Sequence, residues 1–274
     1  MQAATFDYIR SMVKQQAGIV VEPGKEYMAE SRLAGIAREQ GHPGLEGFIE
    51  QLRTRPFGEL HRRVVEALTV NETSFFRDHR PFDCLRATII PSMLVGRPDR
   101  RLAIWCAASS SGQEPYSLAM LLREHFPRIA ANTRIIATDI SREMLARTQR
   151  GVYSQFEIGR GLPATMLAKY FLPAGAEWQL KPEIRAMVET REVNLANPFP
   201  SLPPIDILMV RNVLIYFDLA SKQDILNRMR RTLSTDGVVM LGGAETTLGI
   251  EVGLERCTSD NKAAWYRTTR KETR

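Results

Sequence analysis

From about residue 100 to residue 242, short apolar runs alternate with longer amphipathic stretches, and this alternation limits the folds open to the chain. The apolar runs predict strands at Leu102 to Ala107, Arg134 to Ile140, Ile205 to Val210 and Val238 to Gly242. The stretches between them predict helices at Glu114 to Phe126, Ser141 to Gln149 and Leu219 to Leu233, the last closed by Asp236-Gly237. Such alternation is typical of a parallel sheet covered by helices, so the predicted fold class is α/β.

Two other parts of the chain depart from this alternation. Residues 151 to 192 contain a predicted helix at Pro163 to Tyr170 and then turn-rich, β-prone sequence, which predicts an antiparallel subdomain inserted into a domain of residues 81 to 274. Residues 1 to 69 show helical periodicity and predict an all-α N-terminal domain, joined through a linker at 70 to 80. The apolar positions behind this periodicity are Phe6, Ile9, Val13, Leu45, Phe48, Ile49, Leu52, Phe57, Leu60, Val64 and Leu68.

Charge and composition narrow the range of partners. The 274-residue chain has a formal net charge of +6, which favours an acidic partner, yet residues 1 to 80 balance acids and bases almost evenly. The surplus lies later in the chain, so a basic N-terminal arm is absent and no nucleic-acid partner is expected. No apolar run reaches the roughly 18 residues that span a bilayer, and no signal peptide is evident, so we expect a cytoplasmic protein without direct membrane insertion. Three cysteines without CxxC spacing suggest neither disulfides nor a metal site.

Small and polar residues follow the first two predicted strands. The first strand runs into the turn Ala108 to Pro115 (ASSSGQEP), where small side chains would let a ligand approach the backbone as the next helix begins. The second strand ends in Asp139, where doubly wound folds often place an acid that accepts hydrogen bonds from a ribose. Asp139 or Ser141 could instead cap the following helix. Together the two features favour a ribose-containing ligand at this edge of the sheet.

Two further polar segments have both a functional and a structural interpretation. The segment Arg211 to Phe217 (RNVLIYF) follows the third strand, where ligands of open α/β sheets bind. Asn212 could equally form a turn, and Tyr216 could be a core aromatic residue. The segment 71 to 78 (NETSFFRD) lies between the helical and α/β parts and could cover a cleft, or it could be a linker whose Phe75 and Phe76 dock on a core.

Taken in order, five strings resemble the CheR family of chemotaxis receptor (protein-glutamate) O-methyltransferases. They are NETSFFRD (71–78), ASSSGQEPYSLAM (108–120), ATDIS (137–141), VNL (193–195) and RNVLIYF (211–217). The resemblance implies a Rossmann-like S-adenosylmethionine-dependent methyltransferase domain behind the all-α domain, with S-adenosyl-L-methionine as cofactor and S-adenosyl-L-homocysteine as product. It also implies methylation of glutamate side chains in the cytoplasmic helical bundle of methyl-accepting chemotaxis proteins, for chemotactic adaptation.

The same resemblance implies a set of cofactor-binding residues, with Asp139 on the ribose and Glu114 on the amino group of the methionine portion. The set is Asn71, Thr73, Arg77, Glu114, Asp139, Asn194, Leu195, Arg211 and Asn212. Residues 109 to 111 and Gln113 depart from the family, in which a cysteine, another small residue and a glutamate are common here. The turn nevertheless stays small and Glu114 is retained.

Some members of this family dock a C-terminal receptor pentapeptide on the inserted subdomain. Here the segment Leu172 to Glu183 is short and lacks the glycine-rich turn of those members, so we expect no strong pentapeptide tether. Receptor recognition would then depend on the helical domain, where Arg53, Arg55, Arg62 and Arg63 either meet an acidic helix face or form an ordinary solvated surface. A monomer is the default expectation, because no amphipathic stretch requires a partner helix.

The residue types agree with a carboxylate as methyl acceptor. A glutamate side chain is ionised at pH 7 and needs no general base. None of the four histidines, His42, His61, His79 and His125, lies in the five strings. Catalysis should therefore depend on positioning and on exclusion of water. We expect two catalytic residues, Arg77 to orient the carboxylate and Tyr216 to donate a hydrogen bond near the reacting centre.

Other interpretations stay open at this stage. Arg77 could form a structural ion pair with Asp78 or Glu72 in the linker. The scaffold alone would also suit a methyltransferase acting on RNA or on a small molecule, or a non-catalytic module that binds the cofactor and signals through protein contacts. An amine acceptor is disfavoured because the one segment resembling an Asn-Pro-Pro-aromatic loop, residues 197 to 200 (NPFP), precedes a strand instead of ending it.

Overall fold

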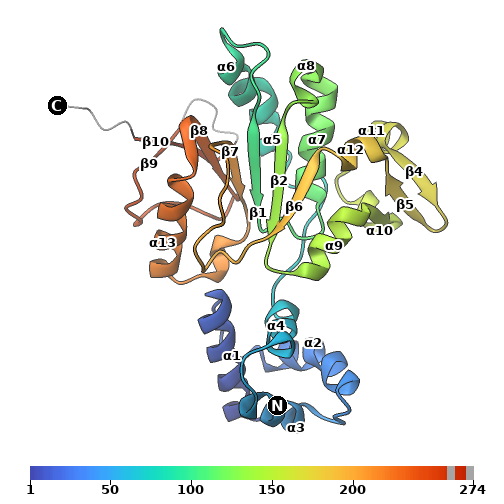
Figure 1. Ribbon diagram of the computed structural model, residues 1–274, viewed down its shortest axis with the longest axis vertical. Coiled ribbons are helices and arrows are strands. Elements are labelled where there is room, and N and C mark those ends of the chain that lie inside the picture. Colours follow the sequence, from blue (N-terminus) through green and yellow to red (C-terminus); the bar gives the residue numbers. More distant parts are fainter. Residues whose placement is uncertain (258–262, 270–274) are drawn as a thin grey trace.

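The computed structural model describes residues 1–257 and 263–269 and consists of an α/β domain, a small insertion and a helical N-terminal domain (Figure 1). The main sheet has seven strands in the order β6-β2-β1-β7-β8-β10-β9. These strands are β6 (Val188–Glu192), β2 (Arg134–Asp139), β1 (Ala103–Ala107), β7 (Ile205–Val210), β8 (Leu233–Leu241), β10 (Trp265–Thr268) and β9 (Leu254–Arg256). The first five are mutually parallel, and β10 runs antiparallel to its neighbours, so the predicted α/β fold is confirmed.

Both faces of this sheet are covered, because successive side chains of a strand point to opposite sides. In β1, Ile104 and Cys106 belong to one buried cluster, whereas Trp105 and Ala107 belong to another. The first cluster contains residues of α7 (Gln113–His125) and the short helices before β1, and the second contains residues of α13 (Leu219–Arg230). The remaining helices of the domain are α5 (Arg80–Cys84), η1 (Leu85–Ile89), α6 (Ile90–Leu94), α8 (Pro127–Ala130), α9 (Arg142–Arg150) and η2 (Leu214–Tyr216).

The predicted end of the last helix was wrong. We expected Asp236-Gly237 to close a helix that reached Leu233, but α13 ends at Arg230 and both residues lie within β8. Gly237 is needed for a close approach of strands, since a Cβ atom there would lie 2.7 Å from the carbonyl oxygen of Ile205 in β7. The register of β7 and β8 shifts at this point.

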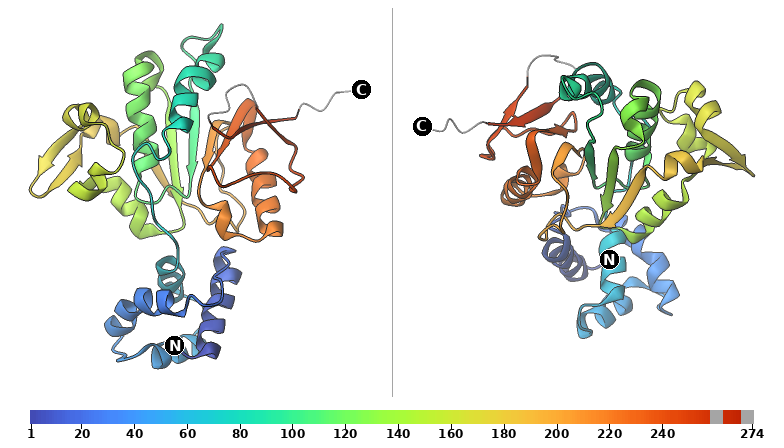
Figure 2. Two further views of the ribbon diagram at one scale, coloured as in Figure 1. Left: turned by 180° about the vertical axis from the view of Figure 1, so that it is seen from behind. Right: turned by 45° about the horizontal axis from the view of Figure 1, so that its top comes forward.

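The insertion forms a separate three-stranded antiparallel sheet with the order β3-β5-β4, as predicted. Its elements are β3 (Val152–Ser154), α10 (Gln155–Gly159), α11 (Ala164–Tyr170), β4 (Phe171–Ala174), β5 (Glu177–Leu180) and α12 (Pro182–Arg185). The predicted limit at residue 192 was too late, because β6 pairs in parallel with β2 and therefore belongs to the main sheet. Figure 2 shows the insertion at the edge of the sheet opposite to β9 and β10.

Gly161, in the loop between α10 and α11, packs the insertion against the linker. Its φ is +86°, and a Cβ atom would lie 2.1 Å from the carbonyl oxygen of Phe75. We expect Gly161→Ala to lower the free energy of unfolding by about 2 to 3 kcal/mol, because both the backbone angle and the contact oppose a side chain. Gly175→Ala, with φ +66° and open space, should cost only about 1 kcal/mol. Urea denaturation measures both, and equal losses would contradict the close packing.

The N-terminal domain contains α1 (Ala3–Ala17), α2 (Glu26–Glu39), α3 (Leu45–Thr54) and α4 (Glu59–Ala67). Its buried side chains form a core of their own, which confirms the predicted all-α domain. Helix α2 was not among the predicted segments, because two of its three buried positions, Ala29 and Ala37, are alanines and carry little apolar signal. No helix of residues 1–257 and 263–269 is long and apolar enough to cross a bilayer.

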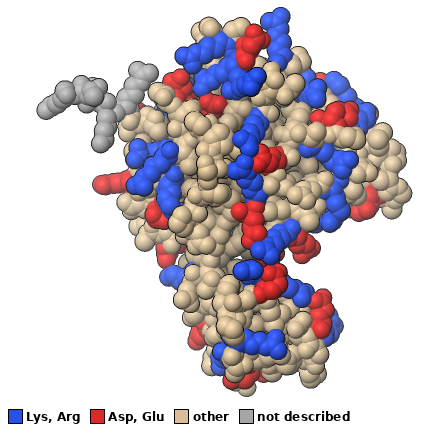
Figure 3. Space-filling view, viewed as in Figure 1, with Lys and Arg blue, Asp and Glu red and all other residues tan. Residues whose placement is uncertain are grey.

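Most of the arginines suggested for receptor recognition already have partners within this domain. Arg62 pairs with Glu59, Arg63 pairs with Glu39, and Arg53 donates to the carbonyl oxygen of Ala4. Figure 3 accordingly shows basic and acidic side chains side by side over the helical domain. The surface is thus charge-paired, and this lowers its attraction for an acidic helix.

Candidate active site

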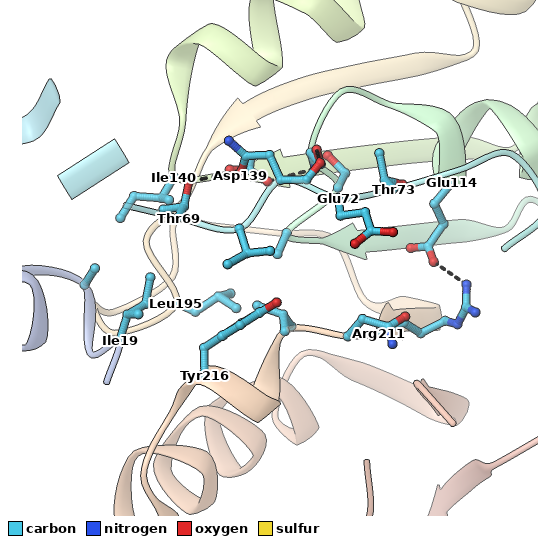
Figure 4. Close-up of a pocket in the computed structure, with 18 of the residues that line it drawn as sticks. Ile19, Thr69, Glu72, Thr73, Glu114, Asp139, Ile140, Leu195, Arg211 and Tyr216 are labelled. Carbon is cyan, nitrogen blue, oxygen red and sulfur yellow. Dashed lines mark hydrogen bonds and ion pairs between the residues drawn. The ribbon is translucent and has the colours of Figure 1, made fainter. Parts of the chain in front are cut away.

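A cavity of roughly 880 Å³, partly open to solvent, lies at the C-terminal ends of β1, β2 and β7 and is closed on one side by the N-terminal domain and the linker (Figure 4). All ten residues predicted for the site line it. They are Asn71, Thr73, Arg77, Glu114, Asp139, Asn194, Leu195, Arg211, Asn212 and Tyr216. Segments distant in the sequence are therefore brought to one place, at the edge of the sheet where α/β proteins bind ligands.

The turn after β1 forms the upper wall of this cavity. Ala108 and Ser110 have φ angles of 54° and 51°, and Gly112 has 94°. A Cβ atom on Gly112 would lie 2.7 Å from Thr148 in α9, so a glycine is required at this point. The left-handed angles turn the chain sharply between β1 and α7, and small side chains leave the backbone accessible to a ligand.

The structure assigns helix capping to Ser141 and leaves Asp139 available for a ligand, the two roles between which the sequence could not decide. Ser141 caps α9, because its hydroxyl accepts a hydrogen bond from the amide of Met144 at 3.3 Å. The carboxylate of Asp139 instead accepts from the amides of Ser110 (2.8 Å) and Ser141 (2.9 Å) and lies at the cavity wall. Burial raises the pKa of Asp139, and those backbone hydrogen bonds oppose the increase.

An ion-pair cluster around the buried side chain of Arg211 forms the opposite end of the cavity. The guanidinium of Arg211, whose side chain is 1% exposed, donates to Glu114 at 2.8 Å and to Asp78 at 2.8 Å. It also donates to the carbonyl oxygen of Arg77 at 2.8 Å. Burial raises the pKa of Glu114 despite the adjacent guanidinium. Arg211 thus fixes the linker and Glu114 relative to each other.

The linker both docks its phenylalanines on a core and covers a cleft, the two roles considered for it. Phe75 and Phe76 are buried in the main core, while Asn71, Thr73 and Arg77 line the cavity. The alternative ion pair of Arg77 is not formed: its guanidinium donates to the carbonyl oxygen of Glu72 at 2.9 Å. The carboxylate of Glu72 instead pairs with Arg160 at 2.8 Å, and that of Asp78 pairs with Arg211.

Tyr216 reaches into the cavity from the segment after β7, and Figure 4 shows its hydroxyl directed toward the interior. This side chain is only partly buried, and within the described residues its hydroxyl has no hydrogen-bond partner. Burial raises the pKa of Tyr216, so the phenol stays protonated at neutral pH. The interpretation as a core aromatic with a satisfied hydroxyl is therefore wrong, and Tyr216 is an available donor.

Asn194 lines the cavity, but both polar atoms of its side chain already form hydrogen bonds within the protein. Its side-chain amide donates to the carbonyl oxygen of Gln16 at the end of α1 at 2.6 Å, and its oxygen accepts from the amide of Ala196 at 3.0 Å. The predicted side-chain contact with a cofactor thus competes with a contact between domains.

One wall residue of the cavity, Ile19, was not among those predicted from the sequence. Ile19 lies between α1 and α2 and lines the cavity beside Val70. It is held there by a β-bridge to Phe217, and the amide of Val20 donates to the carbonyl oxygen of Tyr216 at 2.8 Å. No local pattern could identify Ile19, because its role depends entirely on how two domains pack.

Backbone strain is concentrated around this cavity. Within the described residues, all non-glycine residues with left-handed φ fall in the linker, in the turn after β1 or in the segment after β7. They are Phe76, Asp78, His79, Ala108, Ser110 and Asn212. Strained backbone of this kind persists where the surrounding structure requires it, most often at ligand sites.

Unsatisfied polar atoms indicate what the cavity can hold. Ser109 Oγ, Arg211 Nε and Asn212 Oδ1 are buried without a hydrogen-bond partner, which is costly unless a ligand completes them. A ribose suits Asp139, and an amino acid moiety suits the Glu114 and Arg211 pair. Fold and site together are those expected of an S-adenosylmethionine-dependent methyltransferase.

Comparison with known proteins gives the particular family. Two family models match the chain. The model described as "CheR methyltransferase, all-alpha domain" matches residues 4–69, and the model described as "CheR methyltransferase, SAM binding domain" matches residues 71–262. The chain therefore belongs to the CheR methyltransferase family, as its motifs predicted.

Relatives match over most of their length. The chain is 39% identical to the chemotaxis protein methyltransferase Cher2 of Pseudomonas putida over 250 residues, which cover 89% of this chain and 91% of that protein. It is also 39% identical to chemotaxis protein methyltransferase 1 of Pseudomonas aeruginosa, over 88% of this chain and 90% of that one. A TehB-like methyltransferase structure from Corynebacterium glutamicum matches with 12% identity and a TM-score of 0.39, over 70% of this chain and 96% of that one, and supports no conclusion.

Cofactor binding should weaken as the pH becomes mildly acidic. Burial raises the pKa of both Asp139 and Glu114, so each takes up a proton at a higher pH than an ordinary carboxylic acid, whose pKa is about 4. Protonation removes the attraction of these groups for a cationic cofactor, so affinity is highest above the raised pKa values and declines as the pH falls through them. Calorimetric titrations between about pH 8 and about pH 5 test this. Affinity that does not change with pH in the wild type would contradict it, and Glu114→Gln should show a shallower decline.

Proposed function

We propose that this protein methylates glutamate side-chain carboxylates of methyl-accepting chemotaxis proteins, giving glutamate methyl esters and S-adenosyl-L-homocysteine, and so serves chemotactic adaptation. The observation that carries this proposal is that every carboxylate lining the cavity is already engaged. Asp139 accepts backbone hydrogen bonds, Glu114 pairs with Arg211, and Glu72 pairs with Arg160. No histidine lines the cavity in the described part of the chain. A general base is thus missing, and an acceptor that arrives already ionised fits such a site.

The cofactor supplies an activated methyl group when bound. Transfer of that methyl group to an ionised carboxylate oxygen would leave the electron pair of the broken carbon–sulfur bond on sulfur and would require no proton transfer. Since opposite charges disappear in this step, the protein contributes mainly alignment and exclusion of water. We assign Arg77 to orienting the acceptor, because its guanidinium keeps further N–H groups beyond the one bonded to Glu72. Tyr216 is assigned to donating a hydrogen bond at the reacting centre.

A second cavity supports a path for the acceptor. It shares Ile19, Val70 and Tyr216 with the first cavity, and its other walls come mainly from the segment between α1 and α2. Tyr216 therefore stands where the two spaces meet. We propose that residues 1–69 present the receptor helix on this side, that residues 70–80 join this domain to the methyltransferase domain of residues 81–274, and that the insertion makes no strong pentapeptide tether.

Transfer of label from methyl-labelled S-adenosylmethionine to receptor-containing bacterial membranes tests the proposed acceptor. Glutamate esterification predicts that mild alkali releases volatile labelled methanol from the receptor band. Base-stable label would indicate methylation of nitrogen instead. Cofactor binding by calorimetry without any transfer would indicate a non-catalytic sensor, and a receptor lacking its methylation-region glutamates serves as the control.

A further inference from the structure

Glu245 lies outside the cavity lining, yet its carboxylate is buried and fully engaged with backbone groups. It follows β8 in a turn closed by a hydrogen bond from its own amide to the carbonyl oxygen of Gly242 at 2.9 Å, and it is 7% exposed. One carboxylate oxygen accepts from the amides of Val213 (2.9 Å) and Leu214 (2.7 Å). The other accepts from the amides of Asn212 (2.8 Å) and Gly242 (2.8 Å). Four backbone donors therefore converge on one side chain.

The three consecutive amides belong to the segment that carries cavity residues. Strand β7 ends at Val210, so Asn212, Val213 and Leu214 have no strand partner for their amides. Asn212 also has a φ of 58°, which turns the chain out of the sheet. Such a concave run of N–H groups binds an anion, and here the anion is a side chain of the same protein.

We propose that Glu245 is a positioning residue for methyl transfer: it holds the segment Arg211 to Tyr216 from behind, so that the Tyr216 hydroxyl meets the acceptor in alignment with the transferred methyl group. Arg211 itself has independent support from Glu114, Asp78 and the carbonyl oxygen of Arg77. Loss of Glu245 therefore disturbs Tyr216 and the backbone of Asn212 more than it disturbs Arg211 and Glu114. The effect on turnover depends on the proposed glutamate acceptor, whereas the effect on the backbone does not.

Glutamine cannot replace this carboxylate, although it has the same shape. Each oxygen of Glu245 accepts two N–H groups. Whichever way a carboxamide is oriented, its NH₂ group faces two donors and leaves them unsatisfied. Glu245→Asp keeps both acceptor oxygens but is one methylene shorter, so it should show the same defect in milder form.

Asp206 offers a matched control at the other end of the same strands. Its carboxylate is also buried and accepts from the amide of Ala103 at 2.9 Å, from Arg100 at 2.6 Å and from Ser234 at 2.9 Å. It joins the starts of β1, β7 and β8, far from the cavity residues. Asp206→Asn should therefore lower stability without changing turnover per folded molecule.

The experiment compares the full-length wild type, Glu245→Gln, Glu245→Asp and Asp206→Asn. We expect Glu245→Gln to lower kcat at least about tenfold while its S-adenosylhomocysteine Kd stays within about threefold, because a misplaced group impairs the chemical step more than binding. Hydrogen exchange followed by mass spectrometry should accelerate in peptides covering residues 211–217 and not in those covering β1 and β2.

Each outcome decides between the alternatives. Wild-type enzyme that transfers no label to the receptor would contradict the proposed acceptor, while faster exchange at 211–217 would still support the backbone role of Glu245. Wild-type transfer with unchanged kcat in folded Glu245→Gln would overturn the positioning role. An equal loss of kcat in Asp206→Asn would also overturn the positioning role. Failure of both Glu245 variants to fold, while Asp206→Asn folds, would overturn it too, since the carboxylate would then serve only stability.

Discussion

Asp139→Ala is expected to weaken S-adenosylmethionine binding at least about 100-fold. Hydrogen bonds to a charged group contribute about 1.5 to 3 kcal/mol each, and the two hydroxyls of a ribose could each donate to this carboxylate. Its orientation is fixed by the amides of Ser110 and Ser141, so the loss cannot be compensated by a neighbouring side chain. Isothermal titration calorimetry, performed well below the melting temperature of the variant, measures the change in Kd.

Ser141→Ala is the matched control for this prediction. It removes the helix cap of α9 at a cost of about 1 kcal/mol in stability but leaves the carboxylate and both backbone donors in place. Its cofactor Kd should therefore equal that of the wild type. Normal cofactor affinity in Asp139→Ala, or equal losses in the two variants, would remove Asp139 from the ribose site.

Tyr216→Phe is expected to bind the cofactor normally and to lower kcat about 100-fold, as the loss of one aligned donor often does. The ring keeps its packing, and only a hydroxyl without a protein partner in the described residues is removed. Because burial raises the pKa of Tyr216, the wild-type phenol remains a donor across neutral pH. Initial rates of receptor methylation, together with calorimetry of S-adenosylhomocysteine binding, separate the two effects.

Tyr170→Phe provides the comparison for Tyr216. Its hydroxyl donates to Glu124 on the outer side of α7, away from the cavity, so this variant should lose some stability and retain its turnover. A similar fall in kcat for both variants would mean that hydroxyl loss acts through the fold. Binding defects of equal size in Asp139→Ala and Tyr216→Phe would contradict the division of roles between them.

The main sheet was predictable because its strands are short, apolar and separated by amphipathic helices. The predicted element boundaries were wrong where one sequence pattern is compatible with two kinds of structure. Asp236-Gly237 has the composition of a helix end, but the glycine instead allows β8 to approach β7. Residues 188–192 have a mixed composition typical of a small exposed sheet, whereas pairing with β2 places them at the edge of the main one.

The candidate site was predictable to the extent that its residues follow strand ends. Asp139 and Asn212 could be located by the topological rule for α/β sheets, and the order of the motifs added the remaining positions. Ile19 and Glu245 could not be found in this way. Ile19 reaches the cavity through domain packing, and Glu245 acts on main-chain amides, whose need for an acceptor depends on backbone angles that the sequence does not state.

The bridge between Ile19 and Phe217 affects how the two domains can diverge in evolution. Its contacts, together with the bond from Val20 to Tyr216, are made by main-chain atoms. Substitutions of Ile19 and Val20 therefore preserve the main-chain pairing, whereas Gly18 must stay small because its φ is +71° and a Cβ atom there would lie 3.1 Å from the ring of Phe217. A one-residue insertion or deletion between α1 and α2 would shift the junction and displace Tyr216. Helical domains of relatives should accordingly be exchangeable when the segment between α1 and α2 has the same length, even if their sequences differ. The length of this segment, more than its composition, determines which domains can be exchanged.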